Sequence, residues 1–257
     1  MSQVFRQCAA AALAVAGALA ATSSHAVLIS SGPVAPNPVL AGTGLNGAFY
    51  DTDVAANLSN ANTLIASGST QRAAFLAKVI DYPQGSGSVP DGTPLSTYLG
   101  TNAANVVGVN GGNPNTQNLA DSLFRFHGYI NITSAMDTDA SNGTIDVTFR
   151  VGSDDGMRLT IGNTVVTSYL NDRAFGYSDG VASFSTAGLY AIELVYGEEQ
   201  GNTGVEMLWK VGSSTAAFGL VGTANLYTVP EPGSIALAGL ALLGAAASRR
   251  KARRKQG

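Results

Sequence analysis

The stretch Thr148-Phe149-Arg150-Val151-Gly152-Ser153-Asp154-Asp155-Gly156-Met157-Arg158-Leu159 contains two strand patterns separated by an acidic turn. Phe149 and Val151 alternate with polar residues before the turn, and Leu159 continues an alternation after it. Neighbouring side chains in a strand point to opposite faces, so two adjacent carboxylates can meet at one point only where the backbone turns. Gly156 makes such a turn inexpensive.

The same period of two runs through the second half of the chain and predicts a series of strands. These are expected at Phe124–Ile132, Ile145–Val151, Arg158–Val166, Val181–Phe184, Leu189–Tyr196 and Val205–Val211. Earlier strands are expected around Phe49-Tyr50 and in Phe75–Tyr82. No long amphipathic helix is predicted between the two ends of the chain, so the fold class is expected to be all-β, a sandwich or a barrel.

Two segments of the first half predict other structure. Leu95–Leu99 is expected to form a short helix, with Thr93 as its cap and Pro94 at the first helical position. Residues 101–120 are rich in Asn and Gly and have little to bury, which predicts a long loop.

The N-terminal end has the pattern of a secretory signal peptide. Arg6 is followed by an apolar run from Ala9 to Ala21, and Ser24-His25-Ala26 places small residues at a cleavage site. Residues 1–26 are therefore expected to form a signal helix that a signal peptidase removes.

The C-terminal end has a second sorting pattern. Pro230-Glu231-Pro232 precedes an apolar run, and a cationic cluster that begins at Arg249 and Arg250 follows it. The apolar run Ile235–Ala247 has 13 residues, short of the roughly 20 needed to span hydrocarbon. Residues 229–257 resemble the PEP-CTERM sorting signal, although an ordinary weak tail anchor remains an alternative. The resemblance implies recognition by an exosortase, transient insertion of the apolar helix into the inner membrane, and a Gram-negative-type bacterium.

Charge and cysteine content limit the possible partners of the exported part. The chain has 14 basic and 17 acidic residues; without Arg6, the six tail cations and Glu231, 7 basic and 16 acidic residues remain, a net charge of −9. This balance argues against nucleic acid as a partner and permits divalent cations. The single cysteine, Cys8, lies in the signal, so the exported domain is expected to fold without disulfides.

Several segments together resemble the anthrax protective-antigen domain family. They are Gly44-Leu45-Asn46-Gly47 with Phe49-Tyr50, Phe124–Tyr129, Thr148–Leu159, Gly188–Tyr196 and Leu208-Trp209. The resemblance implies a twisted antiparallel β-sandwich over residues 44–212, between a flexible lead-in at 27–43 and a linker at 213–228. Several branches of the family bind carbohydrate, and the adhesin branch uses calcium.

The resemblance also implies a metal site. In the adhesin branch the two consecutive aspartates are joined by a cis peptide bond and both contact calcium, which points to Asp154 and Asp155 here. Calcium takes about 6–8 oxygen ligands, so a neighbouring loop has to contribute. The best candidate is the loop 197–204, where Glu198 stands about where the adhesins have Asn. The alternative is a solvated acidic turn at a strand end.

The expected ligand-binding rim is the loop 169–180, which mixes aromatic and hydrogen-bonding side chains. Its candidate residues are Asn171, Asp172, Arg173 and Tyr177, together with Asn202 from the loop 197–204. His127 is expected to be a packed or rim histidine rather than a catalytic one, and Trp209 to belong to the core.

Two functions are compatible with these patterns. One is a cell-surface or extracellular-matrix protein that binds exopolysaccharide or another glycan, with calcium as a cofactor. The other is a structural surface or matrix protein without specific glycan binding. An enzyme is not expected, because catalytic carboxyl pairs are separated and differently tuned, and the sequence shows no such pair.

Overall fold

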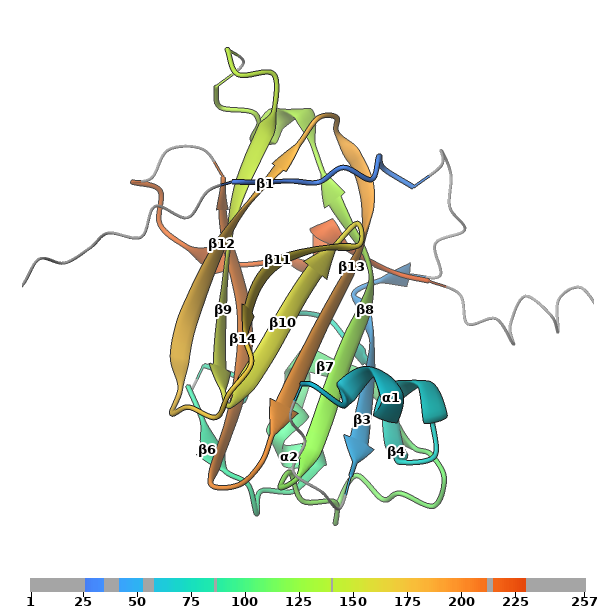
Figure 1. The fold of residues 1–257 in the computed structure, drawn as a ribbon. Helices are drawn as coiled ribbons and strands as arrows, with labels where there is room; N and C mark the ends of the chain where they lie inside the picture. The colour runs from blue at the N-terminus through green and yellow to red at the C-terminus, as the bar shows by residue number, and fades with distance from the viewer. Residues whose placement is uncertain are drawn as a thin grey trace, which may run out of the picture.

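The computed structural model describes residues 26–34, 42–52, 58–85, 87–139, 141–211 and 215–229. In these residues two mainly antiparallel sheets pack face to face, and the helices are short (Figure 1). The all-β sandwich predicted from the alternation is therefore confirmed. Within the described residues no helix combines the length and the apolar character needed to cross a membrane. The predicted signal helix and sorting helix lie outside the described residues.

One sheet has seven strands. Its order is β1 (Val27–Leu28), β12 (Gly176–Phe184), β9 (Ile145–Asp154), β14 (Asn202–Val211) and β15 (Gly219–Leu220), and β5 (Asp81–Tyr82) and β6 (Val89–Pro90) also pair with β14. β9 pairs with β12 on one side and with β14 on the other over most of its length. The predicted segment 145–151 is thus the centre of this sheet.

The second sheet has nine strands. Its order is β11 (Thr164–Tyr169), β10 (Gly156–Ile161), β13 (Gly188–Glu198), β8 (Ser122–Ile132), β3 (Leu45–Asp51), β4 (Gln71–Ala77) and β7 (Ala103–Gly108), joined by β16 (Leu226–Thr228) and β2 (Gly42–Thr43). β9 lies in the first sheet and β10 in the second. The Asp154-Asp155 turn therefore carries the chain from one sheet to the other.

The helical elements lie at the margins of the sandwich. They are α1 (Ala61–Ser67), α2 (Leu95–Leu99) and the 3-10 turns η1 (Gly100–Asn102), η2 (Ser134–Met136) and η3 (Thr223–Asn225). α1 covers part of the outer face of the nine-stranded sheet, where Leu64 and Ile65 pack against a cluster that includes Tyr50, Leu123 and Val195. α2 confirms the predicted helix, but Pro94, not Thr93, occupies its N-cap position.

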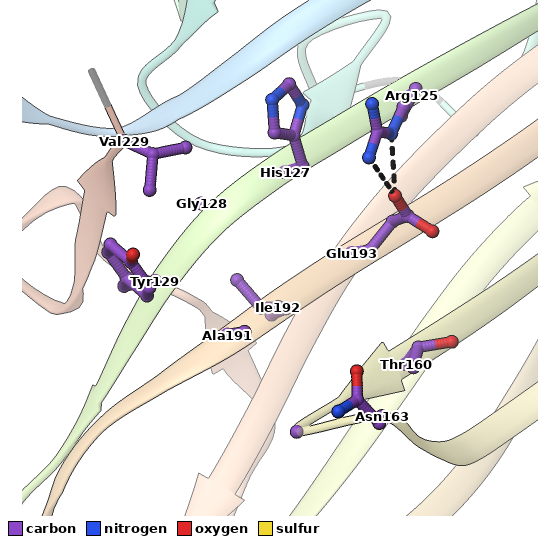
Figure 2. A pocket seen from close by; sticks show the side chains of 11 residues that line it. Arg125, His127, Gly128, Tyr129, Thr160, Asn163, Ala191, Ile192, Glu193 and Val229 are labelled. Atoms are coloured by element: carbon purple, nitrogen blue, oxygen red, sulfur yellow. Dashed lines mark hydrogen bonds and ion pairs between the residues drawn. The ribbon is translucent and has the colours of Figure 1, made fainter. Parts of the chain in front are cut away.

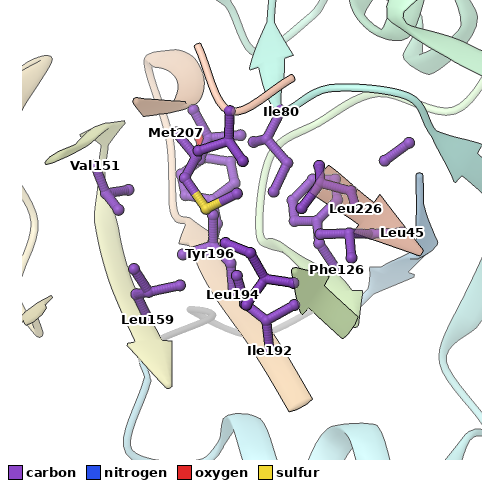
Figure 3. Packing of buried hydrophobic residues seen from close by; sticks show 14 of the residues in the cluster. Leu45, Ile80, Phe126, Val151, Leu159, Ile192, Leu194, Tyr196, Met207 and Leu226 are labelled. Carbon is purple, nitrogen blue, oxygen red and sulfur yellow. The ribbon is translucent and has the colours of Figure 1, made fainter. Parts of the chain in front are cut away.

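The core fills the space between the sheets with the inward side chains of both. Val151 and Met207 from the seven-stranded sheet meet Leu159, Leu194 and Phe126 from the other (Figure 3). Phe126 is fully buried and stacks on Tyr82, with ring centroids 5.8 Å apart. Burying one such side chain contributes roughly 1.5–3 kcal/mol, so this layer holds the sandwich together without disulfides.

Several predicted boundaries differ from the structure. The predicted loop 169–180 ends earlier, because β12 begins at Gly176 and includes Tyr177. The predicted strand segment 75–82 divides between β4 and β5, which belong to different sheets. Residues 101–120 are not all loop, because β7 pairs with β4 at the edge of the nine-stranded sheet. The lead-in 27–43 supplies β1, which pairs with β12, and β2. The linker 213–228 supplies β15 and β16, which pair with β14 and β8. Each of these strands is short, and partners distant in sequence define it, so no alternation marks it.

Candidate functional site

The end of the sandwich where β9 and β13 stop carries a concentration of acidic side chains. Asp154 ends β9, Asp155 follows it, Glu198 ends β13, and Asp172 stands in the loop between β11 and β12. We call these four residues the acidic tip. In Figure 1 this end lies at the bottom, where β6 also lies. The structure thus brings the predicted metal residues to one end of the molecule.

Asp154 and Asp155 are joined by a cis peptide bond, as the family resemblance implies. They are only 6% and 7% exposed. The two carboxylate oxygens of Asp155 accept backbone N–H groups from two different loops, that of Arg173 at 2.9 Å and that of Glu199 at 3.1 Å. The Asp155 carboxylate therefore ties the loop after β11 to the loop after β13.

Burial shifts the protonation of both carboxyls. Desolvation raises the pKa of Asp154, and the charge of Asp155 acts in the same direction, against hydrogen bonds from Ser88 and from the Phe175 backbone. Desolvation also raises the pKa of Asp155, opposed by the two backbone N–H groups and supported by the charge of Asp172. Mutual repulsion and burial make the negative charge at this end costly unless a cation joins it.

Glu198 lies deeper than the aspartates and is fully buried. Its Oε2 is 2.9 Å from the Tyr196 hydroxyl, whereas its Oε1 is buried and has no hydrogen-bond partner in the described part of the chain. Burial raises the pKa of Glu198 to about 9, and the nearby Asp155 and Asp154 charges add to the shift. An unpartnered buried carboxyl oxygen is uncommon in folded proteins and marks a site with unmet bonding capacity.

Tyr196 connects the core to the acidic tip. Its ring stacks on Phe124 at 5.5 Å, and its hydroxyl donates to the Asp154 carbonyl oxygen. The same hydroxyl accepts the Gly204 N–H at 3.1 Å and lies 2.7 Å from the Thr203 hydroxyl. The core therefore fixes the backbone on which the two aspartates stand.

Arg173, a predicted ligand contact, is held by neighbouring groups. Its Nη2 donates to the Ser153 hydroxyl at 2.7 Å and its Nε to the Ser153 carbonyl at 3.2 Å. Its Nη1 donates to Ser178 at 3.0 Å, and the guanidinium lies 4.3 Å from the ring centre of Tyr169. These contacts brace the loop after β11 against β9. That Arg173 also contacts a ligand stays a prediction.

Tyr177 lies on the outer face of the seven-stranded sheet and is 53% exposed. Its hydroxyl donates to Glu206 at 2.6 Å, across Gly152 of β9. A Cβ at Gly152 would lie 2.7 Å from the Phe175 ring and 2.9 Å from the Tyr177 ring, so only glycine lets both rings lie against the strand there. Tyr177 thus lies two residues along β9 from Asp154, on a surface that continues from the tip.

The other predicted rim residues flank the acidic tip. Asn171 and Asp172 are exposed in the loop after β11. Asn202 is exposed at the start of β14, where it pairs with Pro90 of β6. The structure therefore distributes them on two sides of the aspartate pair, and their contact with a ligand stays a prediction.

The donor set fits a hard cation in part. Carboxylate oxygens are the ligands that calcium prefers, and two nearly buried carboxylates stand side by side. The described residues contain no group of three or more His, Cys, Asp or Glu side chains arranged to hold a metal ion. A cation on Asp154 and Asp155 would therefore need carbonyl groups or water to complete its shell.

The sequence did not point to some residues that build this end. The backbone at Gly87 approaches so closely that a Cβ at Gly204 would lie 1.9 Å from the Gly87 carbonyl oxygen. Ser153 donates its hydroxyl to the Asp155 carbonyl at 2.6 Å. In the sequence, only the glycines of these segments indicated that two backbones approach closely. They did not indicate which segments are in contact.

Comparison with solved structures defines the class of fold. The PA14 domain of MpAFP antifreeze protein matches with a TM-score of 0.59 and 22% identity, over 74% of this chain and 93% of that one. The PA14 sugar-binding domain from an RTX adhesin matches with a TM-score of 0.55 and 18% identity, over 73% and 99%. The epithelial adhesin 9 A domain from Candida glabrata, solved with Galβ1-4GlcNAc, matches with a TM-score of 0.51 and 12% identity, over 79% and 97%. The fold is that of a PA14 domain.

The C-terminal end provides the second part of the identification. Residues 228–251 match the PEP-CTERM protein-sorting motif, which confirms the resemblance seen in the sequence. The motif marks the chain for export and sorting by an exosortase. Residues Pro230, Glu231, Pro232, Arg249 and Arg250 lie outside the described residues. No curated protein sequence matches the chain significantly.

Proposed function

We propose that this protein is a non-enzymatic glycan-binding protein of the bacterial cell surface or extracellular matrix, and that it binds a glycan at the acidic tip. The observation that carries the proposal is the pair of nearly buried carboxylates, Asp154 and Asp155, on the loop-bearing end of a PA14 fold. Two of the similar solved structures are a PA14 sugar-binding domain and an adhesin domain in complex with Galβ1-4GlcNAc. The sorting motif supports placement outside the cell.

Calcium is part of this proposal. Asp154 and Asp155 would hold the ion, and the ion would compensate the negative charge concentrated there. Glu198 lies beneath them and would join the ion by shifting its side chain and losing the proton that its raised pKa retains near pH 7. The unpartnered Oε1 of Glu198 supports this role. Bound calcium would offer its remaining coordination positions to sugar hydroxyls.

The residues around the ion would determine which glycan binds. Asn171, Asp172 and Asn202 are exposed on either side of the aspartate pair and offer hydrogen-bonding groups. Tyr177 offers an exposed ring next to them, and sugar rings pack well on aromatic faces. Arg173 would act mainly by holding its loop in place.

A glycan array probed with the purified full chain tests the proposal. We expect calcium-dependent binding to at least one glycan, and loss of this calcium-dependent binding in chelator and in Asp155→Asn. Asp139→Asn is the matched control, because Asp139 is an exposed acid that precedes β9, whereas the tip lies where β9 ends. Absence of binding to every glycan in calcium would overturn the proposal and leave a structural surface protein as the better description.

A further inference from the structure

The outer face of the nine-stranded sheet contains a pocket that is separate from the acidic tip. Its volume is about 300 Å³, and strands β8, β10 and β13 line it together with Val229 (Figure 2). The pocket lies beside the part of the sheet that α1 covers, since Arg125 contacts both Tyr50 of the α1-covered cluster and Glu193 of the pocket. Among the described residues, no helix covers this part of the face.

Small residues on the strands create the hollow. Ala191 of β13 and Gly162 after β10 line it, and the Gly162 N–H donates to the Ala191 carbonyl at 2.8 Å. Longer side chains surround these small residues. Glu193 of β13 lies opposite His127 of β8 and opposite Thr160 of β10 in the strand register. The register of the three strands therefore places several polar side chains around the small residues at the base of the pocket.

The charged groups in the pocket neutralise one another. Nε and Nη2 of Arg125 both donate to Oε2 of Glu193, at 2.6 Å each. Figure 2 shows both contacts ending on the same oxygen, which leaves Oε1 of Glu193 to accept a further hydrogen bond. A ligand here would meet a fixed ion pair without an excess charge of either sign.

His127 adds a donor to the pocket. Its Nδ1 is buried without a hydrogen-bond partner among the described residues. Because a proton on Nδ1 would be a buried donor without an acceptor, we assign the proton of the neutral ring to Nε2. Burial, supported by the charge of Arg125, lowers the pKa of His127 to about 4 and keeps the ring neutral near pH 7.

We propose that this pocket is a second, ion-independent site that binds one neutral pyranose residue of a glycan. Its polar lining consists of Arg125, His127, Tyr129, Thr160, Asn163 and Glu193, an assortment of donors and acceptors around a neutral centre. The Tyr129 ring and the Val229 side chain add apolar surface, which suits the C–H faces of a sugar (Figure 2). The volume is at the lower limit of small-molecule sites, so it fits a single sugar unit.

Saturation-transfer NMR on the full chain in EDTA tests the site. The probes are galactose, glucose, mannose and N-acetylglucosamine, with glucuronate and galacturonate as charged counterparts. We expect transfer to at least one neutral sugar and weaker transfer to the uronates. No transfer to any neutral sugar, or equal affinity for uronates, would overturn the proposal.

Two variants locate the binding in the pocket. Asn163 has a left-handed backbone (φ 67), so Asn163→Gly removes the amide and keeps a conformation that glycine adopts freely. We expect about fivefold weaker affinity from the lost hydrogen bond, and a similar loss from Thr160→Val. Asn105→Gly is the matched control, because Asn105 is also left-handed (φ 53) and lies in β7 outside the pocket. Unchanged affinity in both pocket variants would contradict the site.

The same measurement separates this inference from the proposed function. Asp155→Asn disables the acidic tip and should leave binding in EDTA unchanged. If Asp155→Asn abolishes it, the sugar binds at the tip without calcium, so the second site and the calcium requirement are wrong while glycan binding at the acidic tip stands.

Discussion

Substituting Asp154 distinguishes two interpretations of the acidic tip, a calcium site and a solvated acidic turn. Its carboxylate is nearly buried beside Asp155 and has a raised pKa, so removing its charge in the absence of metal should cost little. With calcium at about 100 times its Kd, the wild-type chain should gain about 2.7 kcal/mol, which corresponds to roughly 5–10 °C in melting temperature.

Differential scanning calorimetry of the wild type and Asp154→Asn, in calcium and in EDTA, tests this prediction. We expect the wild type to melt higher in calcium and the variant to melt at the same temperature in both. Equal wild-type melting temperatures in excess calcium and in EDTA would show that the ion site does not exist.

His127 gives a prediction for pH dependence at the residue scale. Burial lowers its pKa from 6.5 to about 4, with Arg125 adding to the shift and Glu193 opposing it. Between about pH 4 and pH 6.5, His127 binds a proton in the unfolded chain but not in the folded one. The contribution of the neutral ring to the free energy of unfolding is therefore complete above about pH 6.5 and decreases as the pH falls toward 4. Because the ring is half-buried, we expect a loss of about 1–2 kcal/mol, less than the full shift would give.

Urea unfolding at pH 7, 5.5 and 4.5 measures this effect. His127→Gln cannot titrate, so its stability should decline less than that of the wild type over the same interval. Parallel declines in the two proteins would assign the acid sensitivity to groups other than His127.

The sequence predicted which residues form the tip but not how their side chains lie. Asp154 and Asp155 could be singled out because the protective-antigen domain family has two consecutive aspartates at the corresponding turn. The sequence predicted Arg173 as a ligand contact and did not show that its side chain is bound within the protein. Its partners Ser153 and Ser178 come close to it only in the folded sheet, where β9 pairs with β12.

At the scale of elements, long strands were predictable and short edge strands were not. β8 and β9 alternate over many residues because one face of each packs in the core. β16 has three residues and is defined by its contacts with β8 and β2. Such a strand has too few residues for a period to be recognised, and its pairing depends on tertiary contacts.

Substitution of Gly128 in β8 tests whether close packing against this glycine stabilises β16. A Cβ there would lie 2.3 Å from the Tyr227 carbonyl oxygen and 2.8 Å from Leu45 Cδ2, so Gly128→Ala should displace β16. We expect a loss of about 1–3 kcal/mol, typical of overpacking, and faster proteolysis near residues 226–229.

Gly219→Ala is the control for this element, because a Cβ at Gly219 meets no atom within 4 Å. Urea denaturation and limited proteolysis of both variants measure the effect. If the two variants are equally stable and equally resistant, the close fit of β16 over Gly128 does not stabilise the sheet.

The whole molecule combines a β-sandwich with a C-terminal sorting motif. The cationic cluster begins inside the matched motif, at residues 249–251, and lies outside the described sandwich. Replacing its six cations with Gln should therefore block sorting and leave folding unchanged, because positive charge keeps the end of an apolar segment on the cytoplasmic side.

Cell fractionation with an antibody to the folded domain measures sorting. Replacing the Arg residues of the cluster with Lys keeps the charge and should preserve surface delivery. Equal surface amounts of the Gln variant and the wild type would contradict a role for the cluster in sorting.

Asp154 and Asp155 are the residues through which the acidic tip is proposed to bind a glycan. Isothermal titration calorimetry of the best glycan from the array measures this role, in calcium and in EDTA, with the wild type, Asp155→Asn and Asp139→Asn. We predict similar affinities in calcium for the wild type and Asp139→Asn, and loss of the calcium-dependent heat of binding in Asp155→Asn. Calcium-dependent binding by Asp155→Asn with the affinity of the wild type would contradict the proposed role of the pair.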